Sequence, residues 1–340
     1  MSLLAASSSA GGYASLSRTH GARRARPCRC TRDAWALPVP SSALYAGTPP
    51  SPASAQLLYL LSHEPHLFAA AAEEHRAGLA AAAQSASGSE TQQDLSSRIS
   101  LLRASEARNA DVEALLSLQV GSVLGARHAT LHAAVPQLAD APLPGRITVD
   151  TLHLLLPDEP MALHEMCAHA DAIMPAGTSE TAVCRLDALS GGRLLAGSIQ
   201  FGYFLSAVFS ATAPLAEPEL RRMARNMRTA QAWGAARART ATLWGITADA
   251  AHALDDFSTG VTLAPSAAAS EFYSGPTEGS ISVSNTDAST LPPVSALQPL
   301  RPSALRDLVA EAALWGWHLR RVEAEMEADP RCKGLLTLKQ

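Results

Sequence analysis

An aromatic-glycine motif that occurs twice limits the folds open to this 340-residue chain. Residues 201–208 read FGYFLSAV, and residues 315–322 read WGWHLRRV, 114 positions later. The match extends back to Leu194 and Leu308, which keep the same spacing from their motifs. Spacings of 7, 4 and 3 are near multiples of the helical period, so the large apolar residues of each copy share one helix face. The repeat therefore predicts two related core helices.

Each copy keeps a glycine at its centre, Gly202 in the first and Gly316 in the second. A glycine inside a helix costs roughly 1 kcal/mol relative to alanine. Beside a stripe of bulky residues, the missing side chain lets a second helix backbone come close. We therefore expect both glycines at close helix contacts and interpret the neighbouring aromatic residues as core, with ligand stacking as the alternative.

The first 32 residues differ in composition from the rest of the chain. They contain six arginines and no Asp or Glu, with many Ser, Ala and Gly. Such a composition is typical of an organelle transit peptide, and an apolar segment long enough for a secretory signal is missing. The net charge is −4, and −10 after these six charges are removed. An acidic mature chain is a poor phosphate binder, so we expect no nucleic-acid partner.

The five cysteines are too few and too scattered for a disulfide framework. Two of them lie in the predicted transit segment. In a reducing compartment we expect the others, Cys167, Cys184 and Cys332, to be free thiols.

Helical patterns cover most of the chain after residue 50. Helices are expected at 54–63, 66–83, 96–128, about 190–212, 217–245, and from a cap at Ser303 onward. Another helix opens at Pro160, behind Asp158 and Glu159, with the preferred acid and proline at its start. Residues 146–156 are interpreted as a short strand or an extended stretch.

These patterns predict a mainly α-helical protein with at most a small strand pair. Residues 1–50 form the transit peptide and the N-terminal tail. Two related helical halves, 54–213 and 217–329, pack as one bundle-like unit. The second half contains a linker at 258–302 that is rich in Ser, Thr, Pro, Ala and Gly, with a small strand possible at 280–284.

The stretch HEMCAH at 164–169 resembles a zinc-protease motif at first sight. That motif needs two histidines at i and i+4, whereas His164 and His169 are five apart and point roughly 140° away from each other. His164 and Cys167 could share a metal ion, but no further ligands follow at a suitable spacing. We therefore predict no metal site here.

The other histidines give no stronger signal. His128 and His132 have the i, i+4 spacing without an accompanying carboxylate or cysteine, so we expect ordinary surface or half-buried residues. His63 and His66 flank Pro65 at a helix break, where capping and packing explain them. The hydrolase, phosphate-loop and dinucleotide fingerprints are missing from the sequence. We predict no catalytic, cofactor-binding or metal-ligating residues and no cofactor.

One segment is long enough to cross a bilayer. Residues 194–216 contain 23 positions without a charge. The repeat argues against insertion, because the equivalent helix carries Asp307, Glu311, Arg320 and Arg321. We therefore expect a buried central helix, with a membrane anchor as the alternative.

Three stretches resemble a plastid family described as domain of unknown function 760, which includes the UV-B-induced chloroplast protein. They are QLLYLLSHEPHLFAAAAEEHRAGL (56–79), FGYFLSAV (201–208) and LVAEAALWGWHLRRVEAEME (308–327). The resemblance covers roughly residues 54–329 and implies a chloroplast location and two copies of the domain. It implies no catalytic residues, and of the HEMCAH stretch it retains only Glu165 and Met166.

The expected function follows from these observations together. We expect a soluble chloroplast protein, in the stroma, that binds an unknown protein partner or regulates it without catalysis. A link to light or UV stress is implied by the family resemblance alone. An enzyme with an unrecognised or metal-assisted site and a plastid membrane protein anchored through 194–216 are the alternatives.

Overall fold

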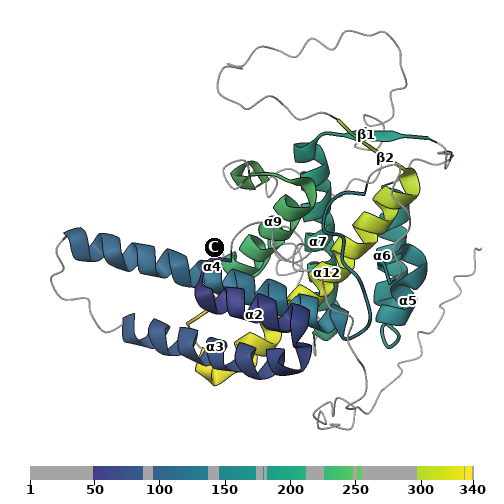
Figure 1. Cartoon of the computed structure of the whole chain (residues 1–340). Helices are drawn as coiled ribbons and strands as arrows, with labels where there is room; N and C mark the ends of the chain where they lie inside the picture. Colours follow the sequence, from purple (N-terminus) through teal and green to yellow (C-terminus); the bar gives the residue numbers. More distant parts are fainter. Residues whose placement is uncertain are drawn as a thin grey trace, which may run out of the picture. The chain divides into compact units, whose positions relative to one another are not determined.

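The computed structural model describes residues 49–86, 95–136, 145–173, 179, 182–211, 226–247, 251–254, 297–332 and 334–338. All of these residues belong to one compact unit, Trp35–Gln340. The described part is mainly helical and contains one two-stranded antiparallel sheet, which confirms the predicted fold class (Figure 1). The predicted transit segment 1–32 and the possible strand 280–284 lie outside the described residues.

The helices and strands carry the labels of Figure 1. The helices are α2 (Pro52–His63), α3 (Pro65–Ala86), α4 (Leu95–Gly125), α5 (Leu152–Leu155), α6 (Pro160–Ala172), α7 (Ala188–Ser210), α9 (Ala230–Trp244) and α12 (Pro302–Ala328). Two short 3₁₀ helices are η1 (Val149–Thr151) and η3 (Pro330–Cys332), and the strands are β1 (Cys184–Leu186) and β2 (Gln298–Leu300).

Local sequence explains several helix ends. The Asp187 carboxylate accepts a hydrogen bond from the backbone N–H of Ser190 and caps α7. The Thr229 hydroxyl caps α9 in the same way. Gly245 ends α9 with φ 62°, a left-handed conformation that glycine adopts without strain.

The predicted strand at 146–156 is wrong. Only Arg146 forms a β-bridge, with Thr130, and the chain then turns into η1 and α5. Thr148 and Thr151 exchange hydrogen bonds between their side chains and backbone, so the local capping geometry outweighs the β propensity of this stretch.

Three predicted boundaries are also wrong. The helix expected at 217–245 is interrupted, because residues 226–229 are not helical and α9 begins only at Ala230. Ser303 does not cap the last helix, which begins at Pro302 after Arg301 and has no side-chain cap. The strand β2 lies inside the linker expected at 258–302.

The repeat extends beyond the sequence motif to a strand-helix unit. A shift of 114 residues carries the bounds of β1 onto those of β2 and the start of α7 onto the start of α12. In the sheet, Arg185 of β1 pairs with Pro299 of β2, and these two residues are themselves related by the shift. The antiparallel sheet is therefore centred on equivalent residues, as a twofold axis requires.

The helices α7 and α12 pack on each other about the same axis, and both glycines lie at the contact. A Cβ atom added to Gly202 would lie 1.8 Å from the carbonyl oxygen of Ala313, and one added to Gly316 would lie 1.9 Å from that of Ile199. Ile199 and Ala313 are also 114 residues apart. The predicted close contacts are confirmed, and the two repeat units face each other with quasi-twofold symmetry.

The helices α4 and α9 complete this arrangement. α4 packs on α12, α9 packs on α7, and α4 and α9 contact each other, while α2 and α3 pack on α4. The buried apolar residues form one contiguous core, whose largest members, Trp315, Trp317 and Tyr203, come from the two repeat helices. Burial of these three aromatic side chains confirms that they belong to the core, whereas Phe201, the residue equivalent to Trp315, is half-buried.

Among the described residues, no helix combines the length and the apolar character needed to cross a bilayer. The α7 part of the segment 194–216 contributes Leu195, Ile199 and Tyr203 to the core, each at most 1% exposed, whereas Phe209 near its end is 41% exposed.

Candidate functional site

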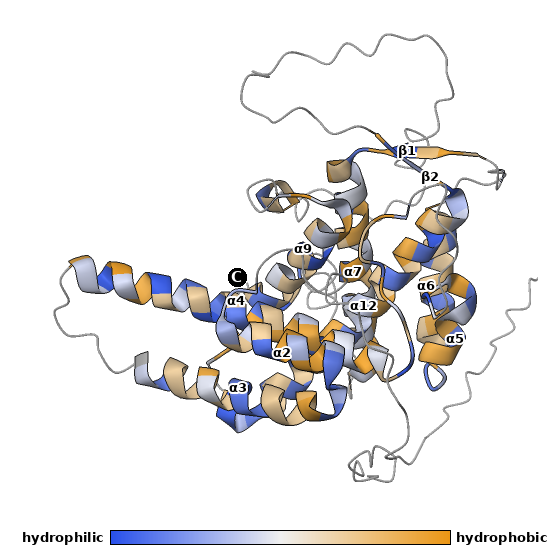
Figure 2. Cartoon of the chain, viewed as in Figure 1, coloured by the Kyte–Doolittle hydropathy of each residue, from blue (hydrophilic) through white to orange (hydrophobic). Residues whose placement is uncertain are grey.

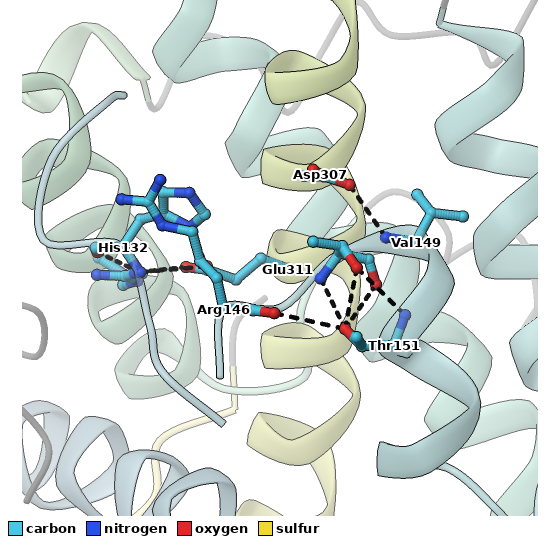
Figure 3. Close-up of polar contacts among 8 residues, drawn as sticks. His132, Arg146, Val149, Thr151, Asp307 and Glu311 are labelled. Carbon is cyan, nitrogen blue, oxygen red and sulfur yellow. Dashed lines mark hydrogen bonds and ion pairs between the residues drawn. The ribbon is translucent and has the colours of Figure 1, made fainter. Parts of the chain in front are cut away.

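A buried cluster of charged side chains joins three distant parts of the chain (Figure 3). Glu311 of α12, His132 after α4 and Arg239 of α9 are 1%, 2% and 3% exposed. Nδ1 of His132 lies 2.5 Å from Oε2 of Glu311, and the backbone N–H of His132 also donates to that carboxylate. The Arg239 guanidinium donates to Glu311 Oε1 at 2.5 Å and to the carbonyl oxygen of His132 at 2.8 Å.

The electrostatics of this cluster keep the carboxylate charged. Burial by itself would raise the pKa of Glu311, but the contacts with His132 and Arg239 outweigh burial and lower it. Burial also lowers the pKa of Arg239, and the charge of Glu311 opposes that effect. The expectation of an ordinary, unaccompanied His132 is wrong, because its carboxylate partner is 179 residues away in the sequence.

A second set of contacts attaches the η1 segment to α12 (Figure 3). The Asp307 carboxylate accepts a hydrogen bond of 3.1 Å from the backbone N–H of Val149, at the start of η1. Asp307 lies in the N-terminal part of α12. Its observed role is to hold a neighbouring segment against that helix.

A second buried cluster lies between α7 and α12, near the start of α9. The Tyr203 hydroxyl donates to the Glu323 carboxylate, which also accepts from Thr229 at 2.5 Å and from Arg320 at 2.6 Å. Burial first, and the charge of Glu323 second, raise the pKa of Tyr203 far above its usual range. Tyr203 is therefore neutral and fixed as a hydrogen-bond donor.

Both clusters connect structural elements and offer little to a substrate. Glu311 and Glu323 are 1% and 0% exposed, and each accepts hydrogen bonds from more than one protein donor. A general base or nucleophile has to reach the reacting atom directly or through one water. The clusters hold the loop after α4, the start of α9 and the two repeat helices together.

The residues of the HEMCAH stretch do not converge. His164 and Glu165 are exposed, and Cys167 is half-buried, with the pKa of its thiol raised by burial and by Asp171. The ring of His169 stacks on Phe201 with centroids 4.2 Å apart. No group of three His, Cys, Asp or Glu side chains in the described part of the chain could hold a metal ion.

His169 has a packing role between α6 and α7. Its Nε2 lies 3.2 Å from the hydroxyl of Ser198, and burial lowers the pKa of His169 to about 4. The histidine is therefore neutral at physiological pH. This contact between two helices could not be found from spacing within the motif.

The histidines at 63, 66 and 128, which the sequence singled out, are exposed. His63 lies 3.1 Å from the carbonyl oxygen of Tyr59 one turn earlier, and His66 is exposed in the first turn of α3. His128 adopts φ 58° in the turn after α4, which ends at Gly125. The i, i+4 spacing of His128 and His132 therefore does not place them on one helix face.

The outer half of α4 carries the most exposed apolar side chains of the longest helix described. Leu95, Ile99 and Leu102 are 69%, 42% and 64% exposed, whereas buried positions begin only at Val112. At 100° per residue these three side chains fall within an arc of about 60°. We call this set, Leu95, Ile99 and Leu102, the outer face of α4.

Basic residues border the outer face of α4 on both sides. With Leu95 set at 0°, Arg98 falls at about 300° and Arg103 at about 80° on the helical wheel. In Figure 1 this half of α4 extends past the end of α2, and Figure 2 shows apolar residues along it. An apolar helix face with flanking cations is a surface suited to a partner, and sequence periodicity could not tell it from a core stripe.

No family model, curated protein or solved structure matches the chain.

Proposed function

We propose that this is a plastid-targeted binding or regulatory protein that works without catalysis and contacts its partner through the outer face of α4. The single observation that carries the proposal is the exposure of Leu95, Ile99 and Leu102 on one face of a helix. Scattered single apolar residues are normal on a protein surface, but three in one stripe indicate an interaction site.

The size of this face sets the strength of the contact. Full burial of a Leu or Ile side chain contributes roughly 1.5–3 kcal/mol, so the three together supply about 5–9 kcal/mol before the cost of association. Association itself costs an estimated 4 kcal/mol or more. The outer face of α4 therefore fits a reversible partner that presents an apolar groove, in the helix-in-groove mode.

Two further observations support the proposal. The buried carboxylates of Glu311 and Glu323 serve as ties between helices and are closed to a substrate. The acid-free, arginine-rich composition of residues 1–32 and the resemblance of the helical stretches to a plastid family support the compartment.

Site-specific crosslinking in stroma from isolated chloroplasts tests the proposal. A photoreactive amino acid at position 102 of the mature chain should give a discrete crosslinked partner. The matched control is position 154, because Leu154 is 65% exposed on the short helix α5 and lies outside the outer face of α4. We expect Ile99→Glu to abolish the crosslink from position 102 and Leu154→Glu to leave it intact.

The opposite pattern would refute the proposed surface. Equal labelling from positions 102 and 154, or a crosslink that survives Ile99→Glu in a folded protein, would show that the apolar stripe is not recognised. Circular dichroism of each variant separates loss of binding from loss of fold.

A further inference from the structure

Two buried polar groups lack a hydrogen-bond partner near the end of α7. Trp317 is 1% exposed and Ser206 is 0% exposed, yet neither the indole Nε1 of Trp317 nor the hydroxyl of Ser206 forms a hydrogen bond within the described structure. Native proteins leave few buried polar groups unpaired, because desolvation without a partner is unfavourable. Each such group therefore needs an explanation.

The quasi-twofold relation places these two groups together. The shift of 114 residues relates three pairs at the α7–α12 contact, namely Tyr203 and Trp317, Ser206 and Arg320, and Phe209 and Glu323. In one half, the Tyr203 hydroxyl meets Glu323, and the Arg320 guanidinium lies 5.8 Å from the centre of the tyrosine ring. In the other half, the Trp317 ring meets Phe209, with centroids 6.1 Å apart. The same symmetry relation makes Ser206 the counterpart of Arg320 and so places it on the Trp317 side of the helix contact.

The Tyr203 side and the Trp317 side of the helix contact differ in whether the aromatic donor has an acceptor. The donor of Tyr203 has an acceptor, the Glu323 carboxylate, supplied by the opposite helix. On the Trp317 side, the residue equivalent to Glu323 is Phe209, whose side chain has no acceptor, and the indole N–H has no hydrogen-bond partner in the described structure. The Trp317 side of the helix contact therefore has two hydrogen-bond donors, the indole N–H and the Ser206 hydroxyl, but no acceptor oxygen for them.

The charges at Arg320 and at its counterpart Ser206 indicate whether a ligand's acceptor oxygen would be charged or neutral. Glu323 is accompanied by the Arg320 guanidinium at 2.6 Å, whereas Ser206, at the position equivalent to Arg320, supplies no cation. A carboxylate buried without a cation suffers a large desolvation penalty. The missing oxygen therefore belongs to a neutral group, such as the carbonyl of a ketone, ester or amide.

Phe209 gives such a ligand a way in. It is the penultimate residue of α7 and is 41% exposed, in contrast to Glu323, which is 0% exposed and lies more than one turn before the end of α12. A side chain at a helix end can turn aside with little disturbance of the core. Its ring and that of Trp317 would then contact the apolar body of the ligand.

We propose that Trp317, Ser206 and Phe209 form a binding site for a small apolar molecule with a neutral carbonyl oxygen, which accepts hydrogen bonds from the indole and the hydroxyl. This site is separate from the outer face of α4, and it is independent of the function proposed above.

Three probes of similar size separate the features of the ligand. Propiophenone carries a neutral carbonyl, propylbenzene carries no acceptor, and benzoate carries a charged one. Titration calorimetry on the full mature chain should show propiophenone binding roughly tenfold more tightly than propylbenzene, as expected for two added hydrogen bonds. Benzoate should bind more weakly than propiophenone.

Variants locate the binding. Trp317→Phe removes the indole N–H and keeps a ring, and Ser206→Ala removes the hydroxyl, so each should lower the propiophenone affinity several-fold. Phe209→Gln supplies an internal amide oxygen and should abolish binding. Trp244→Phe is the matched control, because the Trp244 indole N–H is also buried without a partner but packs against Gly191.

Nuclear magnetic resonance of the indole N–H groups provides a readout that keeps the test valid if a variant unfolds. In the unaltered protein, propiophenone should shift the Trp317 signal and leave that of Trp244 in place. Absence of binding at millimolar propiophenone, equal affinity for propylbenzene, or a shift confined to other tryptophans would each overturn the proposal.

Discussion

Replacing Gly202 by alanine should loosen the central helix pair. The added Cβ would lie 1.8 Å from the Ala313 carbonyl oxygen, and real Cβ atoms keep at least about 3.0 Å. The backbones of α7 and α12 would therefore have to separate by about 1.2 Å at this point, because a backbone oxygen in a helix cannot rotate away. A gap of about 1 Å already removes a quarter to a half of the dispersion energy of the facing atoms.

The size of the effect follows from two opposing contributions. Overpacking of a core costs typically 1–3 kcal/mol, and a backbone-to-backbone clash belongs at the upper end of that range. Alanine gains back roughly 1 kcal/mol of helix propensity. We expect a net loss of about 2 kcal/mol for Gly202→Ala and the same for Gly316→Ala, whose Cβ would lie 1.9 Å from the Ile199 carbonyl oxygen.

Urea unfolding followed by circular dichroism measures the effect. Gly78→Ala on α3 is the matched control, because a Cβ there meets nothing within 4 Å, so it should stabilise the protein by up to about 1 kcal/mol. The double variant at 202 and 316 should lose less than the sum of the single losses, since one separation of the helices relieves both clashes. Stabilisation by Gly202→Ala comparable to that of Gly78→Ala would refute the reasoning.

Four other changes have defined outcomes. Glu311→Ala should lower the free energy of unfolding by about 3–5 kcal/mol in a denaturant titration, because it leaves the Arg239 charge buried without its partner. Burial raises the pKa of Glu113 to about 7, so its contribution to stability should fall as pH rises from about 4.5 through 7, and Glu113→Gln should flatten that fall when unfolding is measured at pH 5 and 8. Burial lowers the pKa of His169 to about 4, so stability should be lost as pH falls from 6.5 to 4, and His169→Gln should reduce that loss in acid unfolding curves. Residues 1–50 fused to a fluorescent reporter should direct it to plastids, and cytosolic fluorescence would contradict the predicted transit peptide.

Periodicity within a helix was sufficient for much of the fold. It placed α2, α3 and the repeat helices to within a few residues, and it identified the glycines of the close contact. These features depend on residues three to seven positions apart, which a helix brings to one face whatever the rest of the chain does. Two of the failures, at Thr148 and Thr229, lie where side-chain capping competes with propensity.

The buried clusters were beyond the reach of sequence spacing. Glu311 meets His132 across 179 residues and Arg239 across 72, and no local pattern marks any of them as a partner of the others. The zinc-like spacing around His164 was set aside on helical geometry, and the observed partner of His169, Ser198, lies on another helix.

The sequence by itself determined the helical class, the duplication and the two glycines, because each is written in short-range spacing or in a direct match between segments. Tertiary structure decided how the copies face each other, which charges are buried together, and which apolar stripe stays exposed. Leu95, Ile99 and Leu102 have the same helical periodicity as a core stripe, and only the packing of the other helices shows that they are left uncovered. Burial depends on which elements meet in space, and that information is spread over the whole chain.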